Sequence, residues 1–334
     1  MNVGIIGLGY WGPNLVRNFL GDHTVTTLTA CDKREDRLKS IKDKFPSVLC
    51  TTNVNDLLKP SIDAIAIATP VDSHYGLAKI ALEAGKHIWI EKPFTATSAQ
   101  AKELIELAEK KNLNIFVDHT FIYTGAVKKT KEIVDRGELG EVLYFDSVRV
   151  NLGLFQHDVN VIWDLAPHDL SIMNYILNNK KITGVSANGI ANYYNLENIA
   201  HLSVYFEENC FAHFHLNWTS PVKIRRMIVG GKKKMLVFDD MENSEKIKVY
   251  DSGVDVEGQE GIYNALVQYR IGDMYSPKVN QTEALSLAVK EFIDSIIKKR
   301  IPLTNAYDGL KIVQILEASE KSIKQKGKLI KLSE

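Results

Sequence analysis

The sequence predicts an α/β fold in two parts. A doubly wound parallel sheet is expected over residues 1–121, and an α+β domain with a mainly antiparallel, open sheet over residues 122–334. The first observation behind this expectation is length, since 334 residues suit two domains. The second is the hydrophobic pattern along the chain. Short apolar runs alternate with helical patterns up to about residue 120, and strand-like runs predominate after Phe121. Alternating strands and helices indicate parallel pairing with helices on both faces of a sheet.

The first domain is expected to hold about six strands. Five runs rich in Ile and Val are each four to eight residues long, at residues 3–6, 25–31, 62–68, 86–90 and 114–118, with a weaker candidate at 48–51. Recognisable start and stop signals mark two of the helices between these strands. Thr97 and Gln100 have the spacing of a capping box, and a helix over 73–84 runs into Gly85, a good C-terminal stop.

The second domain begins with a predicted helix over 125–136 and contains a second one over 164–177. Strands are expected at residues 142–150, 182–191, 200–206, 210–218, 223–229 and 234–238, and two helices close the chain near 283–299 and 306–326. These last two helices are free to pack back on the first domain. The sheet has a face with no obvious helical cover, which is typical of an association surface.

Composition excludes several classes of function. Lysine plus arginine and aspartate plus glutamate both number 41, so the chain lacks the excess positive charge of a nucleic-acid-binding protein. No apolar run approaches the roughly 20 residues of a membrane helix, and no signal peptide is recognised. Cys31, Cys50 and Cys210 are scattered and odd in number, which suits a reducing compartment. We expect a cytoplasmic protein without nucleic-acid or membrane partners.

A glycine-rich turn follows the first strand. Residues 7–12 read Gly-Leu-Gly-Tyr-Trp-Gly, a GxGxxG pattern that leads into a helical run. In a Rossmann dinucleotide-binding domain, Gly7 permits the tight turn, Gly9 lets the backbone approach a pyrophosphate and Gly12 permits close helix packing. The helix N-terminus then offers N–H groups to the phosphates. We take the turn, with its Tyr10 and Trp11, as a cofactor site.

Asp32 ends the second predicted strand, 20 residues beyond Gly12. A carboxylate there accepts hydrogen bonds from the adenosine ribose and repels a 2′-phosphate, so the sequence favours NAD over NADP. Lys33 and Arg34 follow at once and could hold a 2′-phosphate, so use of NADP stays open. Both basic residues could equally be solvated surface side chains.

Three further residues suggest catalysis. Lys92 follows the fifth strand, at the carboxyl edge of the sheet where such folds bind ligands. Asp164 and His168 are four residues apart on a predicted helix and so share one face. The three side chains could move a hydroxyl proton while a hydride leaves for nicotinamide. From spacing alone, a surface lysine and a capped helix with a satisfied histidine remain open.

The ordered combination of motifs resembles one family. GxGxxG with Asp32, Ala-Thr-Pro at 68–70 with His74, Glu-Lys-Pro at 91–93 and Asp164-xxx-His168 together resemble the Gfo/Idh/MocA oxidoreductases along essentially the whole chain. The resemblance implies that Lys92 hydrogen-bonds the reacting oxygen, that His168 is the general base in oxidation and that Asp164 orients it. Which of Lys92 and His168 takes the proton first stays open. It also implies cofactor contacts by Thr69, Pro70, His74, Glu91 and Lys92, and a cis bond before Pro93.

Two segments resemble the branch of this family associated with nucleotide-sugar metabolism, which includes UDP-N-acetylglucosaminuronic acid 3-dehydrogenases. They are residues 161–169 and 118–123, and residues 218–226 resemble that branch as well. Arg225 could meet a diphosphate or carboxylate, although a solvated strand face would suit it too. His119 and Tyr123 lie near the inferred domain junction, where either substrate contact or packing would suit them.

The sequence thus predicts an NAD-dependent oxidoreductase acting on a secondary hydroxyl, C3 of a nucleotide-linked sugar such as UDP-N-acetylglucosaminuronate. One alternative is a dehydrogenase of free polyols or sugars such as myo-inositol, and another is a non-catalytic NAD-binding sensor. No catalytic metal is expected, because the adjacent pair His157 and Asp158 lacks further ligands. Since family members commonly associate through their sheets, the resemblance implies a homodimer or homotetramer.

Overall fold

The computed structural model describes residues 1–153, 155–256 and 267–332. The chain divides into two compact units, and it crosses between them more than once. Unit 1 comprises Met1–Tyr123 and Thr282–Gln314, and unit 2 comprises Thr124–Gln281 and Ile315–Glu334. The first division therefore falls between Tyr123 and Thr124, and a segment from the C-terminal part of the chain belongs to unit 1.

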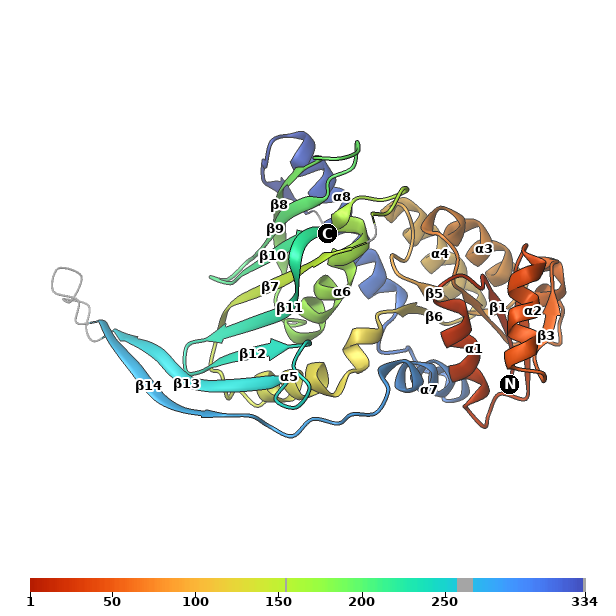
Figure 1. The fold of residues 1–334 in the computed structure, drawn as a ribbon, viewed down its shortest axis with the longest axis horizontal. Coiled ribbons are helices and arrows are strands. Elements are labelled where there is room, and N and C mark those ends of the chain that lie inside the picture. Colours follow the sequence, from red (N-terminus) through yellow and green to blue (C-terminus); the bar gives the residue numbers. More distant parts are fainter. Residues whose placement is uncertain (154, 257–266, 333–334) are drawn as a thin grey trace. The chain divides into compact units, whose positions relative to one another are not determined.

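Unit 1 is built on a parallel sheet of six strands in the order β3-β2-β1-β4-β5-β6 (Figure 1). Every neighbouring pair runs parallel. The strands are β1 (Asn2–Ile6), β2 (Thr27–Cys31), β3 (Leu49–Thr51), β4 (Ala64–Ile67), β5 (His87–Glu91) and β6 (Ile115–Asp118). This order is that of a doubly wound dinucleotide-binding sheet, so the predicted fold class of the first domain is confirmed.

The helices of unit 1 begin and end where local chemistry dictates. They are α1 (Gly12–Leu20), α2 (Glu35–Lys44), α3 (Val71–Glu83), α4 (Ser98–Lys111) and α7 (Ala284–Ile297), with short 3-10 turns η1 (Val54–Leu58) and η2 (Thr120–Tyr123). The Thr97 hydroxyl accepts from the Gln100 backbone N–H, as the capping-box spacing predicts. Gly85 follows α3 with φ +78°, the left-handed conformation that favours glycine after a helix.

Helix α7 completes the core of unit 1. The ring of Phe292 is fully buried and lies edge-on to Trp89 and Phe19, with centroids 5.8 and 6.2 Å away. Phe116 contacts both Phe292 and Trp89, at 5.7 and 4.3 Å. One helix from the end of the sequence therefore fills the aromatic core of a sheet formed by its beginning.

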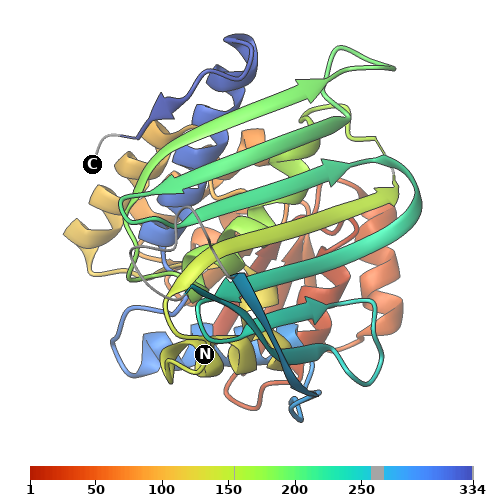
Figure 2. The same ribbon diagram turned by 90° about the vertical axis from the view of Figure 1, so that its left-hand side faces the viewer.

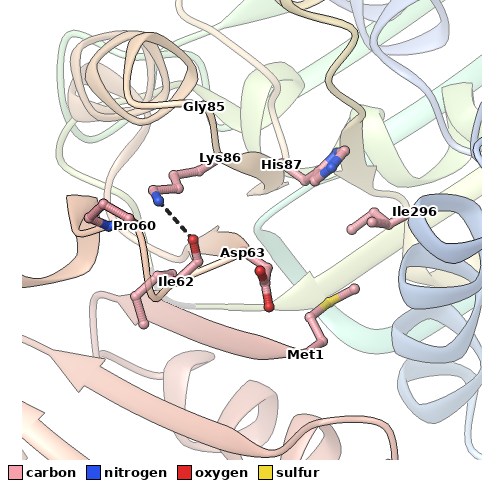
Figure 3. A pocket seen from close by; sticks show the side chains of 8 residues that line it. All are labelled: Met1, Pro60, Ile62, Asp63, Gly85, Lys86, His87 and Ile296. Atoms are coloured by element: carbon pink, nitrogen blue, oxygen red, sulfur yellow. Dashed lines mark hydrogen bonds between the residues drawn. The ribbon is translucent and has the colours of Figure 1, made fainter.

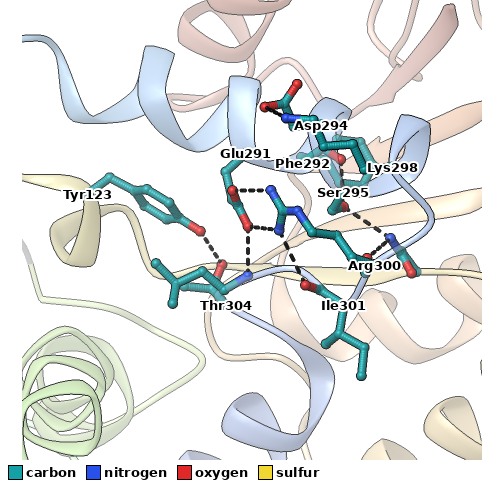
Figure 4. Close-up of polar contacts among 11 residues, drawn as sticks. Tyr123, Glu291, Phe292, Asp294, Ser295, Lys298, Arg300, Ile301 and Thr304 are labelled. Atoms are coloured by element: carbon teal, nitrogen blue, oxygen red, sulfur yellow. Dashed lines mark hydrogen bonds and ion pairs between the residues drawn. The ribbon is translucent and has the colours of Figure 1, made fainter.

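The chain after α7 is fixed beside β6 by polar contacts (Figure 4). The Glu291 carboxylate accepts two hydrogen bonds from Arg300, at 2.6 and 2.7 Å, and one from the Leu303 backbone N–H. The Thr304 carbonyl oxygen accepts a hydrogen bond from the Val117 N–H, and the Thr304 hydroxyl is hydrogen-bonded to the Tyr123 hydroxyl. These contacts hold the end of β6, where the candidate site begins, in a fixed position within unit 1.

Unit 2 has a nine-stranded sheet within the described residues, in the order β14-β13-β12-β11-β7-β10-β9-β8-β15 (Figure 2). Its strands are β7 (Val142–Leu152), β8 (Ile182–Ile190), β9 (Ile199–Phe206), β10 (Phe211–Asn217), β11 (Thr219–Gly231), β12 (Met235–Asp239), β13 (Ile247–Val256), β14 (Val267–Tyr275) and β15 (Ile330–Lys331). All neighbours are antiparallel except β7 and β10. The predicted mainly antiparallel sheet is confirmed, and β13 to β15 extend it beyond the predicted strands.

Helices cover one face of this sheet. They are α5 (Gly125–Asp135), α6 (Val161–Ile176) and the part of α8 (Ala306–Lys324) that belongs to unit 2; α6 packs on β7, β9 and β10. Along β10 the side chains alternate: Ala212, Phe214 and Leu216 are buried, whereas His213 and His215 stand half-exposed on the other face. The sheet therefore has an open face, which Figure 2 presents to the viewer. Within the described part of the chain, no helix is long and apolar enough to cross a membrane.

Removing the Phe292 ring should destabilise the protein strongly. We expect Phe292→Ala to lower the free energy of unfolding of unit 1 by about 3–5 kcal/mol, because a buried aromatic side chain leaves a cavity among rings that cannot close around it. Denaturant unfolding followed by tryptophan fluorescence measures this, since Trp89 lies in the same cluster. Ile297→Ala is the matched control, as that side chain is 56% exposed. Equal losses for both variants would contradict the role of α7 in the core.

Candidate active site

The predicted site residues of unit 1 follow the carboxyl ends of its strands. Gly7 directly follows β1, Asp32 follows β2, Lys92 follows β5 and His119 follows β6, while Thr69 stands two residues after β4. Because all six strands run parallel, their carboxyl ends meet at one edge of the sheet. The sheet itself therefore gathers residues that are far apart in sequence, at the edge where doubly wound folds bind ligands.

The glycines of the turn have different roles. A Cβ atom at Gly12 would lie 2.2 Å from the carbonyl oxygen of Gly7, and one at Gly7 would lie 2.5 Å from that of Ala68. Gly7 also has φ +94°, which other residues rarely adopt. At Gly9, by contrast, the nearest atom is Arg37 Nη1 at 4.0 Å. The first and third glycines are therefore required by the protein's own packing, whereas the middle one leaves space that a ligand could occupy.

Helix α1 begins at this turn with an N-terminus suited to an anion. Trp11 is the N-cap residue and makes no side-chain capping hydrogen bond, and a proline follows in the first turn. Tyr10 is 94% exposed, and its ring lies 6.0 Å from that of Trp11 at an interplanar angle of 20°. An N-terminus that no side chain caps carries a partial positive charge and is a ready phosphate site. The residues present thus fit the pyrophosphate of a dinucleotide.

Asp32 is buried, and both of its carboxylate oxygens accept hydrogen bonds from the protein. Its Oδ2 accepts from the Leu8 N–H at 2.7 Å and from Arg37 Nη1 at 3.2 Å, and its Oδ1 accepts from the Arg34 N–H at 2.9 Å. Burial alone would raise the pKa of Asp32, but the hydrogen bonds from Arg34, Leu8 and Arg37 outweigh it and hold that pKa below its ordinary value. Asp32 is therefore a fixed negative charge beside the glycine turn, as a ribose-binding carboxylate must be.

The basic side chain that contacts the Asp32 carboxylate lies further along the chain than the two that the sequence analysis singled out. Lys33 and Arg34 are exposed, and the Arg34 guanidinium forms two hydrogen bonds to Asp36, at 3.1 and 2.6 Å. Arg37, which the sequence analysis did not single out, is the side chain that reaches Asp32. A helix starting at Glu35 places Arg37 in its first turn, facing the strand end, and this was the signal available in the sequence.

Two loops of this edge are tied together by His74. Its Nε2 lies 2.8 Å from the carbonyl oxygen of Thr69 and its Nδ1 lies 3.0 Å from that of Pro93. Thr69 Oγ1 in turn accepts from Ser73 at 2.7 Å. Burial lowers the pKa of His74, so the ring is neutral and donates to one carbonyl at a time. His74 and Thr69 therefore shape the loop that ends in exposed Pro70 and link it to the loop containing Lys92.

Ionisable residues gather at the ends of β5 and β6. Glu91 is buried beside Asp118 of β6, and Lys92 precedes Pro93 through a cis peptide bond. His119 is also buried, and neither of its ring nitrogens has a hydrogen-bond partner within the described chain. Burial, with the nearby charge of Lys92, lowers the pKa of His119 to about 3, so its ring is neutral. A buried imidazole with both nitrogens unsatisfied is a natural partner for a ligand's polar groups.

Asp164 and His168 lie on α6 in unit 2. Nearly all of this helix is buried, but Asp164, Leu165 and His168 form a half-exposed stripe. Asp164 Oδ2 accepts from the Trp218 indole N–H at 3.0 Å. The helix begins three residues earlier than predicted, because the Asn160 side chain caps it by accepting the N–H groups of Ile162 and Trp163.

A buried ion pair anchors that helix to the sheet. Asp169, next to His168, accepts from Arg149 of β7 at 2.5, 2.9 and 3.0 Å and from Ser147 at 3.0 Å. Both charged side chains are almost completely buried, so the pair is held by several hydrogen bonds rather than by one contact. The face that carries Asp164 and His168 is thereby turned away from the sheet.

Two residues predicted to contact substrate have partners of their own. The Tyr123 side chain is buried, with its hydroxyl 3.1 Å from Thr304 Oγ1 and its ring stacked on Phe116 at 6.0 Å (Figure 4). Arg225 lies in unit 2, where its Nη1 is 3.6 Å from Asp240 Oδ2. Packing accounts for Tyr123 within unit 1, and an ion pair accounts for Arg225.

A pocket of about 450 Å³ lies at the opposite edge of the parallel sheet (Figure 3). It is lined by residues at the amino ends of β1, β4 and β5, among them Asp63 and His87. Lys86 donates to the carbonyl oxygens of Lys59 and Ile62, both at 2.7 Å. Its ammonium is thus used within the protein, and the amino edge of a parallel sheet is not where such folds bind ligands. We assign this pocket no part in the site.

Comparison with protein families agrees with this geometry. Residues 1–119 match the model described as an oxidoreductase family with an NAD-binding Rossmann fold, and residues 127–237 match the GFO/IDH/MocA C-terminal domain. The chain belongs to the Gfo/Idh/MocA family. Membership confirms the predicted family and the predicted NAD-binding Rossmann fold.

Individual relatives are more distant. The uncharacterized oxidoreductase YdgJ of Escherichia coli is 33% identical over 50% of this chain and 51% of its own, and the myo-inositol 2-dehydrogenase of Thermotoga maritima is 27% identical over 57% and 58%. This chain spans about half the length of these two relatives. The UDP-N-acetylglucosamine 3-dehydrogenase of Acidithiobacillus ferrooxidans is 23% identical over 94% of both chains. Its crystal structure superposes with a TM-score of 0.80 over 97% of this chain and 99% of that one.

Neutralising Asp32 should weaken cofactor binding. We expect Asp32→Asn to raise the dissociation constant for NADH by about tenfold, because a hydrogen bond to a charged acceptor is worth more than one to an amide. Discrimination against NADPH should fall as well, since the repulsive charge is gone. Fluorescence titration of the apoprotein with both cofactors measures this, with Asp43→Asn on the exposed side of α2 as the control. An unchanged NADH affinity in Asp32→Asn would place the ribose elsewhere.

Proposed function

We propose that this chain is an NAD-dependent oxidoreductase that transfers a hydride between nicotinamide and a secondary hydroxyl of a sugar, C3 of a nucleotide-linked amino sugar. The observation that carries the proposal is the carboxyl edge of the sheet in unit 1. That edge gathers the glycine turn after β1, the ionised Asp32 after β2 and Lys92 after β5. Bound NAD supplies the hydride acceptor there.

The roles that we propose for the protein's own residues are those that the family resemblance implies. Gly7, Gly9 and Gly12, with Tyr10 and Trp11, hold the pyrophosphate at the start of α1, and Asp32 accepts the ribose hydroxyls. Thr69, Pro70, His74 and Glu91 shape the nicotinamide end. Lys92 donates a hydrogen bond to the reacting oxygen, and His168 exchanges the hydroxyl proton while Asp164, held by Trp218, orients it.

An aromatic group beside Asp164 supports a substrate with a flat or apolar ring face. The Phe155 ring lies 5.5 Å from Trp218, whose indole holds Asp164, and 5.6 and 5.9 Å from Tyr193 and Tyr194. Both tyrosines are more than 60% exposed. Exposed aromatic rings next to a polar reactive group suit a nucleobase or a sugar ring. The relative that matches along 94% of both chains is named for a UDP-linked amino sugar, which supports the same substrate class.

The structure offers less support for a uronate. Arg225, the residue predicted to meet an anionic sugar, already pairs with Asp240, which Lys246 also approaches at 3.6 Å. We therefore place the amino sugar itself, rather than its carboxylate, at the centre of the proposal. A polyol dehydrogenase is the second candidate, because one partial relative is a myo-inositol 2-dehydrogenase.

Parallel assays with NAD separate these substrates. Growth of the NADH absorbance band should be seen with UDP-N-acetylglucosamine or its uronate and not with myo-inositol. Growth with myo-inositol alone would overturn the nucleotide-sugar assignment and keep the catalytic residues. Absence of turnover with every sugar, in a protein that binds NADH, would refute the proposed reaction for this substrate class.

Loss of His168 should affect turnover without affecting cofactor binding. We expect His168→Gln to lower kcat by about 10²-fold or more, because general acid–base catalysis typically contributes that much. Since the NAD-binding domain is unit 1, the NADH dissociation constant should not change. His23→Gln, an exposed histidine of unit 1, is the control. A kcat that His168→Gln leaves intact would assign the proton to Lys92.

The open face of the sheet in unit 2 supports a homodimer or homotetramer. Tyr205 and Phe211 are partly exposed there and pack edge-to-face at 5.4 Å, beside a stack of His201 and His215 at 4.5 Å. Apolar and aromatic groups on a sheet face favour association. Light scattering at working concentration should give twice or four times the chain mass, and a monomeric mass would contradict this.

A further inference from the structure

Two buried carboxyl groups stand side by side at the carboxyl edge of the sheet in unit 1. Glu91 is the last residue of β5 and Asp118 is the last of β6, and the two are partners in the register of these parallel strands. Their residues are only 7% and 2% exposed. Two negative charges in this position would repel one another with little water to screen them.

Their oxygens are incompletely satisfied. Asp118 Oδ1 accepts from the Thr120 hydroxyl, but Glu91 Oε1 and Asp118 Oδ2 receive no hydrogen bond from any donor in the described chain. A buried acceptor without a donor costs free energy. One proton held between the two carboxyls supplies the missing donor for both, as in other carboxyl pairs that share a proton.

The electrostatics of the pair agree with that arrangement. Burial, the charge of Asp118 and a hydrogen bond to it raise the pKa of Glu91 well above its ordinary value. Burial raises the pKa of Asp118 to about 6, although hydrogen bonds from Thr120 and Glu91 oppose the rise. At neutral pH the pair therefore carries one proton and one negative charge, and it becomes neutral as the pH falls below about 6.

The positive charge that acts on the carboxyl pair in unit 1 is that of Lys92. Lys92 acts electrostatically on both carboxyls. His119 is neutral because burial and Lys92 lower its pKa to about 3, and Tyr123 is neutral because burial raises its pKa. Of the side chains described around the pair in this unit, His119, Tyr123 and Thr120 contribute no charge.

We infer that Glu91 and Asp118 hold one proton between them and act as a single acid–carboxylate unit that positions the Lys92 ammonium. This inference rests on the proposed function, in which Lys92 meets the reacting oxygen. Asp118 becomes a positioning residue, acting through Lys92 and not on the substrate. One shared charge attracts the ammonium without the repulsion that two carboxylates would suffer.

A double-mutant cycle tests this. In Glu91→Gln the amide donates to ionised Asp118, and in Asp118→Asn the amide donates to ionised Glu91, so each single variant keeps one negative charge. The double variant keeps none. We expect its kcat to fall about tenfold further than the product of the two single effects, a coupling in the range known for contacting residues. If the kcat loss of the double variant equals the product of the two single losses, the inference is overturned, because independent structural roles for the two residues predict that result.

The pH profile supplies the readout that a structural role would not move. In the wild type, kcat for reduction of the sugar ketone should fall below about pH 6 as the pair takes up its second proton and loses its charge. The reductive direction is used because His168 acts there as an acid, so its protonation gives no acid limb of its own. The double variant should lack this acid limb. Asp63→Asn, an exposed carboxylate at the opposite edge of the same sheet, should leave both kcat and the limb unchanged. An acid limb that persists in the folded double variant would contradict the inference.

Two measurements on the whole apoprotein need no turnover and so separate this inference from the proposed function. Infrared spectra at neutral pH should show the carbonyl band of one buried carboxylic acid, which Glu91→Gln removes. Acylation of Lys92, followed by peptide mass spectrometry, should be faster in the double variant, because the negative charge of the pair no longer holds the lysine side chain in place. Absence of the acid band, or equal labelling in folded wild type and double variant, would refute the pair even if the sugar assays succeed.

Discussion

The parallel direction of six strands is the constraint on which the site of unit 1 depends. Every strand of that sheet ends at the same edge, so each connection to the next helix begins there. The candidate site residues of unit 1 stand at this edge. Residues as distant in sequence as Gly7 and His119 reach it through strand direction alone, and helix α1 places the positive end of its dipole there.

In unit 2 the corresponding constraint is the attachment of one helix. Helix α6 is buried on most of its circumference, and the Arg149–Asp169 pair fixes its rotation on the sheet. Asp164 and His168 are exposed because that rotation leaves their stripe uncovered. Trp218, the single residue between β10 and β11, then fixes the orientation of one carboxylate. A buried ion pair thus determines where two exposed polar residues point.

Local signals in the sequence predicted the parts of the fold that local chemistry controls. The glycine turn, the helix start at Thr97 and the helix stop at Gly85 each follow from a few adjacent residues, and all are present in the structure. Of the predicted capping box at Thr97 only the Thr97 half is formed, because Gln100 Oε1 accepts no hydrogen bond from the described residues. Strands β13 to β15 were not predicted, because they depend on pairing with distant segments, and for the same reason the sequence left open whether the last two helices pack on the first domain. For the same reason Arg37 and Asp118 were not singled out from the sequence as site residues. Arg37 is significant only through Asp32, and Asp118 only through a strand partner 27 residues earlier in the chain.

The return of the chain to unit 1 has a consequence for how the protein is made. Phe292 emerges from the ribosome 169 residues after Tyr123, the end of the first segment of unit 1. At roughly 5–20 residues per second, that interval lasts on the order of ten seconds or more. During it the rings of Phe19, Trp89 and Phe116 lack the side chain that covers them. The nascent N-terminal sheet therefore waits with an uncovered aromatic surface until almost the whole polypeptide has been translated, and it is in this interval that the chain most needs a chaperone.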